Sequence, residues 1–143
     1  MTVAAPAYLA RAGSPRTPED LAHHNCLAFQ LASGRTQPFV YASPAGELSV
    51  SPRGSLVADD GQALVRATVA GLGVLQAHDY MVAEHLAHGE LVELLADWAA
   101  PGPAISVISA PGRKTSPNVQ AFTRLLIDVL GERSPASAGR ERC

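Results

Sequence analysis

The feature that most constrains the fold is the segment SLVADDGQALVRATVAGLGVLQ at residues 55–76. A short apolar strand pattern at 55–58 is followed by Asp59, which suits a helix N-cap, and by Gln62, three residues later as in a capping box. Apolar residues then recur at helical spacing and fill most of the other face too, which predicts a largely buried helix. A strand pattern resumes at Val74–Gln76. The order strand, helix, strand predicts a parallel pair of neighbouring strands joined by a crossover helix.

Gly71 and Gly73 in this segment raise the question of a phosphate-binding turn. A dinucleotide fingerprint needs its glycines after a strand and before a helix. Here they follow the helix and precede the strand, and the third glycine of the motif is missing. We therefore expect one of these glycines to end the helix in a left-handed conformation and to allow close packing of the chain.

Patterns along the rest of the chain predict further helices and strands. Proline in the first helical turn and glycine after the last turn mark most of the helices. The residues from 132 to 143 have no apolar stripe, and we expect a disordered tail there. The expected helices are 6–13, 17–24, 79–89 and 116–131, and the expected strands are 1–5, 26–31, 39–42, 47–51, 90–95 and 104–110.

Composition limits the class of protein. The 143 residues suffice for one domain, or one lobe of a larger one, and the net charge of −2 with a single lysine disfavours a free-standing nucleic-acid binder. Cys26 lies in an apolar segment and suits a small buried hydrophobe rather than a disulfide framework with Cys143. No run is long enough to cross a membrane and no signal peptide begins the chain, so we expect a cytoplasmic protein.

The search for catalytic and metal-binding motifs is mostly negative. His85 and His88 have helical spacing that could share a metal, but no third ligand lies at a matching spacing, so we expect neither a metal nor a cofactor. Asp59 and Asp60 could form an acid–base pair with a histidine. The pattern favours a helix cap followed by a first-turn acid instead, and we expect no catalytic residues.

One positive feature is the edge of the sheet where the two parallel strands end. In open α/β sheets ligands bind at the carboxyl ends of the strands, and exposed amides at a helix N-terminus can hold polar groups. The loop and the turn that follow the two strands should open on this same edge. The candidate ligand-binding residues are Asp59, Asp60, Gly61, Gln62, Gln76, Ala77 and His78.

Three stretches, at 3–29, 56–98 and 116–130, resemble the effector-binding region of LysR-type transcriptional regulators. The resemblance implies an α/β fold with two lobes, like type II periplasmic binding proteins, and a mixed, partly parallel sheet with flanking helices. It implies that the chain carries one lobe plus a return strand and a C-terminal helix. His78 departs from the family, which commonly has proline there; the change makes the turn more flexible and adds a titratable group.

The resemblance also implies a domain layout. Residues 1–5 would form a crossover strand, 6–103 the second lobe, 104–131 the return strand and C-terminal helix, and 132–143 the tail. The N-terminal winged helix-turn-helix and most of the first lobe are absent from this sequence.

The implied function is to bind a small polar effector between two lobes, without catalysis. DNA would be contacted only through the absent helix-turn-helix, and no membrane partner is expected. The apolar stripe on the last helix would normally cover the first lobe, which predicts self-association. Three alternatives stay open: a fragment without function, a small α/β enzyme that uses Asp59 or Asp60, and a free solute-binding protein.

Overall fold

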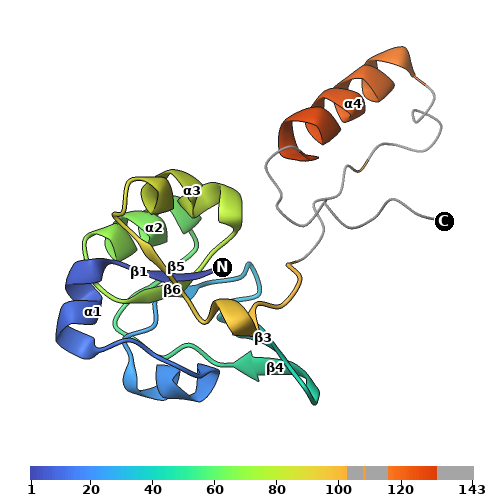
Figure 1. Cartoon of the computed structure of the whole chain (residues 1–143). Coiled ribbons are helices and arrows are strands. Elements are labelled where there is room, and N and C mark those ends of the chain that lie inside the picture. The colour runs from blue at the N-terminus through green and yellow to red at the C-terminus, as the bar shows by residue number, and fades with distance from the viewer. Residues whose placement is uncertain (103–107, 109–115, 132–143) are drawn as a thin grey trace. The chain divides into compact units, whose positions relative to one another are not determined.

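The computed structural model describes residues 1–102, 108 and 116–131, and it divides the chain into two compact units, Met1–Gly102 and Pro103–Cys143 (Figure 1). In chain order the elements are β1 (Thr2–Ala4), α1 (Pro6–Ala12), the 3-10 helix η1 (Pro18–His23), β2 (Ala28–Phe29), β3 (Phe39–Ser43), β4 (Gly46–Val50), β5 (Val57–Ala58), α2 (Gly61–Val69), β6 (Val74–Gln76), α3 (Asp79–Ala87), β7 (Val92–Leu94), the 3-10 helix η2 (Ala96–Trp98) and α4 (Pro117–Gly131).

Most of the expected elements are confirmed, within the one or two residues by which element ends commonly vary. The strand expected at 104–110, except Ile108, lies outside the described residues, as do the tail at 132–143 and Cys143. Cys26 is buried at 1% exposure, and its Sγ lies 3.6 Å from the carbonyl oxygen of Leu21. Burial raises the pKa of this thiol, as expected for a cysteine that packs as a small apolar residue.

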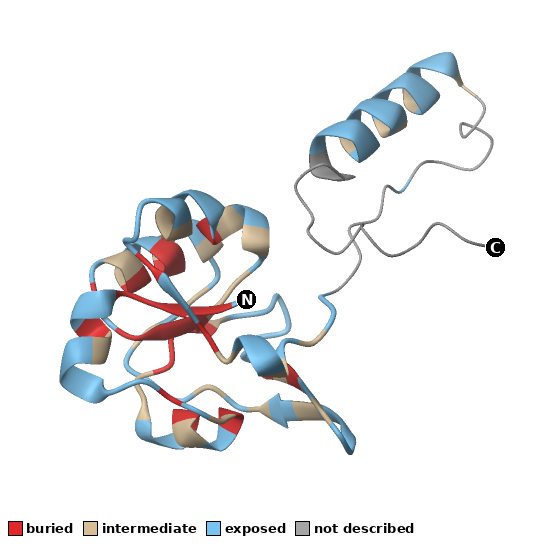
Figure 2. Cartoon of the chain, in the orientation of Figure 1, coloured by how far each residue is buried: buried red, intermediate tan, exposed pale blue. Residues whose placement is uncertain are grey.

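The strand β1 lies between β6 and β7 and runs antiparallel to both. Its three residues are buried, and successive side chains on a strand point to opposite faces. Val3 accordingly packs with Leu64 of α2 and Val82 of α3, whereas Ala4 packs with Tyr8 of α1. The sheet is therefore covered on both faces, and Figure 2 shows the buried residues concentrated along its strands and on the inner sides of the helices.

The strands β5 and β6 are parallel to each other, but the expected direct pairing between them is wrong. The Cys26–Phe29 stretch lies between them: Ala28 pairs parallel with β5, and Cys26 forms a parallel bridge to Val74 of β6. An apolar stretch from earlier in the chain inserts here and bonds to both sides, with Leu27 N–H donating to the Val74 carbonyl at 2.8 Å. The crossover helix α2 thus spans one intervening strand.

The two glycines at the end of α2 have separate roles. Gly71 has a φ of 79°, the left-handed conformation predicted for the residue that ends the helix. A Cβ placed on Gly73 would lie 2.1 Å from the carbonyl oxygen of Asn25, so this position allows two backbones to approach closely. Gly71 therefore ends the helix, and Gly73 lets the start of β6 lie close to the backbone of Asn25, in agreement with the interpretation of the sequence.

The hairpin of β3 and β4 is attached to the main sheet through Tyr41 of β3. Its side chain is 1% exposed, and its hydroxyl lies 2.9 Å from the Oγ1 of Thr2 in β1. Burial raises the pKa of Tyr41 to about 12, because a phenolate would lose its hydration in this apolar cluster.

Alkaline pH is expected to destabilise the fold through Tyr41. Between about pH 10, the ordinary tyrosine pKa, and about pH 12, the unfolded chain ionises at this residue while the folded chain does not, so the free energy of unfolding falls. In urea unfolding across this range, the free energy of unfolding should fall less steeply with pH in Tyr41→Phe than in the native chain. Tyr80→Phe, at a half-exposed tyrosine, is the control and should keep the native slope.

The second unit contributes α4, whose bounds agree with the expected C-terminal helix. On the expected apolar stripe Val119 and Leu126 are half-buried, while Phe122 and Val129 are exposed. That this stripe normally covers another lobe stays a prediction, as does self-association.

Candidate functional site

The loop 59–62 and the turn 76–78 lie at one edge of the sheet, which we call the carboxyl edge. Each follows the end of a strand that is parallel to the Cys26–Phe29 stretch. The start of α2 also touches the first turn of α3, because a Cβ on Gly61 would lie 2.7 Å from the Cε of Met81. The structure therefore places the two predicted segments at the same edge of the sheet, with one strand between the strands that they follow.

The beginning of β1 reaches the same edge. The ammonium group of Met1 donates to the carbonyl oxygen of Ala77 at 2.7 Å, and the Ala77 N–H donates to the Met1 carbonyl oxygen at 2.9 Å. The backbone of Ala77 is therefore fixed by the strand that precedes α1 and is not free to bind a ligand.

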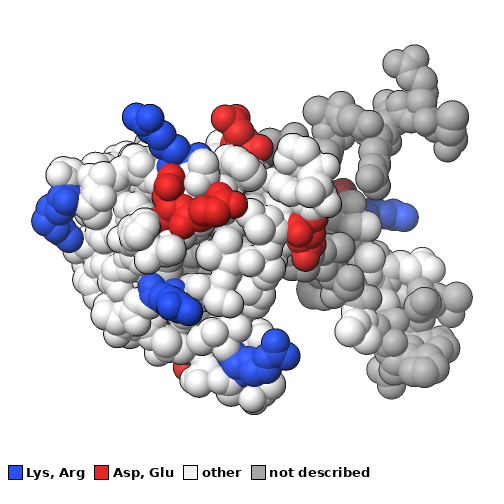
Figure 3. Space-filling model, turned by 90° about the horizontal axis from the view of Figure 1, so that it is seen from below, with Lys and Arg blue, Asp and Glu red and all other residues white. Residues whose placement is uncertain are grey.

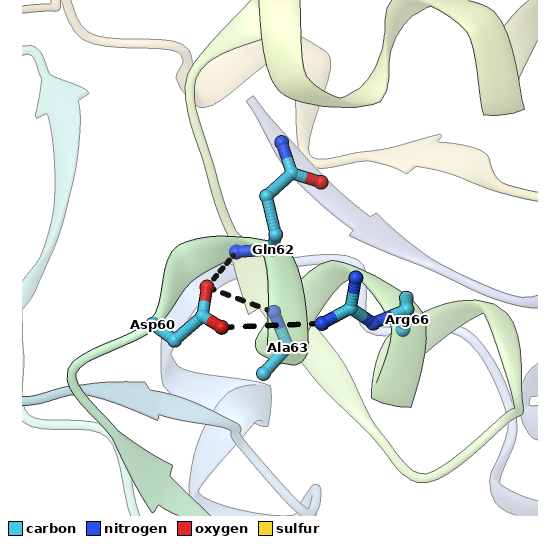
Figure 4. A network of polar contacts seen from close by, with 4 residues as sticks. All are labelled: Asp60, Gln62, Ala63 and Arg66. Atoms are coloured by element: carbon cyan, nitrogen blue, oxygen red, sulfur yellow. Dashed lines mark hydrogen bonds and ion pairs between the residues drawn. The ribbon is translucent and has the colours of Figure 1, made fainter.

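The N-cap of α2 is Asp60, so the expected cap at Asp59 is wrong by one residue. One Asp60 carboxylate oxygen accepts from the N–H groups of Gln62 and Ala63, at 2.8 and 3.2 Å (Figure 4). The other oxygen lies 3.9 Å from Arg66, an exposed ion pair that contributes little. Asp59 precedes the cap and stays exposed.

Loss of the cap should destabilise the chain at one aspartate and not at the other. Asp60→Ala is expected to lower the free energy of unfolding by about 1 kcal/mol, because two N–H groups of the first turn lose their acceptor. Asp59→Ala is the matched control and should stay within about 0.5 kcal/mol of the native chain. Urea unfolding of both variants measures the difference, and the reverse order would place the cap at Asp59.

The two remaining residues of the loop are less available than the sequence suggested. The backbone N–H of Gln62 donates to the Asp60 carboxylate, but the Gln62 side chain is exposed and points away from that carboxylate (Figure 4). The space next to Gly61, which we expected a ligand to approach, is occupied by the end of the Met81 side chain.

The side chain of Gln76 is already bonded within the protein. Its Oε1 accepts from the Val40 N–H at 2.8 Å, and its Nε2 donates to the Val40 carbonyl at 3.0 Å. This pair of bonds to one residue of β3 imitates the pairing of a neighbouring strand. Gln76 therefore holds the hairpin against β6, and its expected role as a ligand contact has no free amide to support it.

Replacing Gln76 by leucine is expected to lower the free energy of unfolding by about 1–3 kcal/mol, because the half-buried N–H and C=O of Val40 lose their partners. Amide exchange at Val40 should accelerate in the same variant. Gln62→Leu, at an exposed glutamine, is the control and should change neither quantity appreciably. Equal effects of the two substitutions would contradict this role for Gln76.

His78 is the N-cap residue of α3 in position, but its side chain makes no capping hydrogen bond. Its ring stacks on Tyr80, with centroids 5.5 Å apart and planes 12° apart. His78 is exposed, and Tyr80 is 50% exposed. Sequence reasoning missed Tyr80 and the contact of Gln76 with Val40, because neither spacing nor periodicity signals them.

The described residues offer little support for catalysis or metal binding. Asp60 is used as a cap, and the hydrogen bonds of this part of the chain include none between Asp59 or Asp60 and a histidine. His85 bonds to Glu90 at 2.6 Å. Within 1–102, 108 and 116–131, no cluster of three potential metal ligands occurs, and no helix is long and apolar enough to span a membrane. On the face in Figure 3, the Lys and Arg side chains do not gather into one patch.

Comparison with known proteins decides the family. Residues 1–131 match the family described as "LysR substrate binding domain". The chain belongs to this family. Its α/β sheet with helices on both faces agrees with the regulatory domains of LysR-type regulators of known structure. This agreement confirms the fold class and the resemblance that the sequence indicated.

Relatives of the LysR domain are transcriptional regulators. The chain is 31% identical over 119 residues to the uncharacterized HTH-type transcriptional regulator YcaN of Escherichia coli, covering 83% of this chain and 38% of that protein. It is 30% identical to the HTH-type transcriptional regulator PtxR of Pseudomonas aeruginosa, covering 92% and 42%. The chain thus spans about two fifths of the length of the curated relatives.

Solved structures give the same family. The LysR-type regulator CrgA of Neisseria meningitidis matches with a TM-score of 0.70 and 25% identity, over 91% of this chain and 44% of that one. The regulatory domain of AphB in Vibrio vulnificus matches with a TM-score of 0.62 and 28% identity, over 71% and 49%. The family and these relatives are regulators and not enzymes, in agreement with the non-catalytic interpretation of the sequence.

Proposed function

We propose that this LysR domain senses a small polar effector at the carboxyl edge, without chemical conversion. The observation that carries the proposal is the convergence of the loop 59–62, the turn 76–78 and the start of β1 at the ends of parallel strands. This is the edge at which open α/β sheets bind ligands.

The effector is neutral or cationic rather than anionic. A helix N-terminus attracts anions through its free N–H groups, but Asp60 already accepts from two of those in α2. The carboxylate of Asp59 is exposed beside it and would repel a second negative charge. Among the predicted site residues, the exposed side chains of Asp59, Gln62 and His78 remain to contact a ligand.

The other wall of the effector site comes from outside this chain. The relatives are more than twice as long, so a first lobe and a DNA-binding helix-turn-helix would be supplied by a longer regulator. With one wall only, the affinity of this chain should be weak, with a dissociation constant of about 1 mM. Such a regulator would act on DNA in the bacterial cytoplasm, as an oligomer.

The proposal is tested by titrating the isotope-labelled chain with glycinamide and with acetate and following its amide signals by NMR. Glycinamide is expected to shift the amides of residues 59–62 and 77–80, and acetate to shift them less. Gln62→Ala should weaken the response, whereas Glu19→Ala in η1 should not. The site is wrong if the shifts cluster at residues 39–41, or if Gln62→Ala leaves the glycinamide response unchanged.

A further inference from the structure

The groups at the carboxyl edge that are exposed and not bonded within the protein limit the class of effector that can bind there. The backbone of Ala77, the side-chain amide of Gln76, and the N–H groups of Gln62 and Ala63 in α2 are bonded within the protein. The exposed groups are the carboxylate of Asp59, the side-chain amide of Gln62, and the rings of His78 and Tyr80. Two of these four are flat aromatic surfaces.

The two rings are arranged as a stacking platform. Their centroids lie 5.5 Å apart and their planes are 12° from parallel, so the rings overlap only in part, and Tyr80 is 50% exposed. Residue 78 takes an extended conformation just before α3, and Tyr80 lies in the first helical turn. Met81, the next residue, touches Gly61, so the first turns of α2 and α3, which carry Gln62 and Tyr80, adjoin each other.

From this juxtaposition we propose that the effector contains a planar ring, neutral or cationic, that stacks on the pair formed by His78 and Tyr80. A further aromatic ring gains from offset stacking, and a cationic ring gains from the π-face of Tyr80 as well. A hydrogen-bond donor on the ring would be bound by the carboxylate of Asp59 or the amide of Gln62. This inference rests on the proposed function, because it assigns a ligand class to the same edge.

Four probes of similar size separate ring shape from charge: benzamide, benzamidine, benzoate and cyclohexanecarboxamide. Titration of the labelled full chain is expected to show benzamide and benzamidine shifting the amides of residues 59–62 and 77–81. Their dissociation constants should be at least about threefold below that of the non-planar cyclohexanecarboxamide. Benzoate should bind more weakly than benzamide, because it brings a negative charge to Asp59.

Substitutions at the platform give a second readout. Tyr80→Leu is expected to weaken benzamide binding by about 2- to 10-fold, whereas Tyr80→Phe, which keeps the ring, should retain it. His88→Ala, at an exposed histidine after the end of α3, is the control and should have no effect. Because Tyr80 is half exposed, these variants should keep the native amide spectrum away from the carboxyl edge.

The outcomes separate this inference from the proposed function. Equal affinity for benzamide and cyclohexanecarboxamide, or an unchanged affinity of Tyr80→Leu for benzamide, overturns the proposal that the effector contains a planar ring. Shifts at the carboxyl edge with glycinamide but with none of the four ring probes overturn it too, while the proposed function stands. If neither glycinamide nor any ring probe shifts that edge, both fail.

Discussion

Replacing Gly73 by alanine is expected to lower the free energy of unfolding by about 3 kcal/mol or more. The new Cβ would lie 2.1 Å from the carbonyl oxygen of Asn25, a backbone atom that cannot rotate away. That carbonyl also accepts from the Val74 N–H at 2.9 Å, so a shift would weaken the pairing of β6 with the stretch that begins at Cys26. Urea unfolding of the variant measures the loss.

Gly102→Ala is the matched control for this substitution. It adds the same methyl group at a glycine that has nothing within 4 Å of the new Cβ and no positive φ. It should leave the free energy of unfolding within about 0.5 kcal/mol of the native value. A fall of similar size in both variants would mean that the loss at Gly73 is not caused by the contact with Asn25.

Leu64→Ala in α2 is the second substitution with a large expected effect, a loss of about 2–5 kcal/mol in the free energy of unfolding. Leu64 is 1% exposed and belongs to the cluster that joins α2 and α3 to β1, so truncation leaves a cavity between the helix and the sheet.

Leu72→Ala removes the same atoms from a side chain that is 44% exposed and serves as the control. Its loss should be well under half of that of Leu64→Ala, since little apolar surface returns to water and no enclosed cavity forms. Comparable losses, measured by urea unfolding under the same conditions, would show that the Leu64 side chain is not in the main core.

Local chemistry made the helices and the hairpin predictable from the sequence. Proline at a first turn and glycine at a last turn act within a few residues, and Gly71 shows the expected left-handed end of α2. The cap was misplaced by one residue because Asp59 and Asp60 are both good caps, and only the backbone conformation selects between them. Asp60 therefore takes the capping role that the pattern gave to Asp59, and Asp59 lies before the helix.

Contacts between distant segments were the part that the sequence could not supply. The insertion of Cys26–Phe29 between β5 and β6 depends on backbone approach at Gly54 and Gly73, where a Cβ would lie 2.3 and 2.1 Å from carbonyl oxygens of Cys26 and Asn25. No spacing of residues in the sequence indicates that the glycines of two other segments pack against this strand. The same holds for Gln76, whose partner Val40 lies 36 positions away and whose polarity alone suggested a ligand contact.

The central place of β1 in the sheet has a consequence for how the chain acquires its structure during synthesis. Both neighbours of β1 lie far along the sequence, and the bond from Met1 to Ala77 joins residues 76 positions apart. On the ribosome, this apolar strand must therefore wait for most of the first unit before it can pair. Closing such a long loop slows folding and leaves unpaired strands open to aggregation, so we expect yield to depend on temperature and on chaperones during expression.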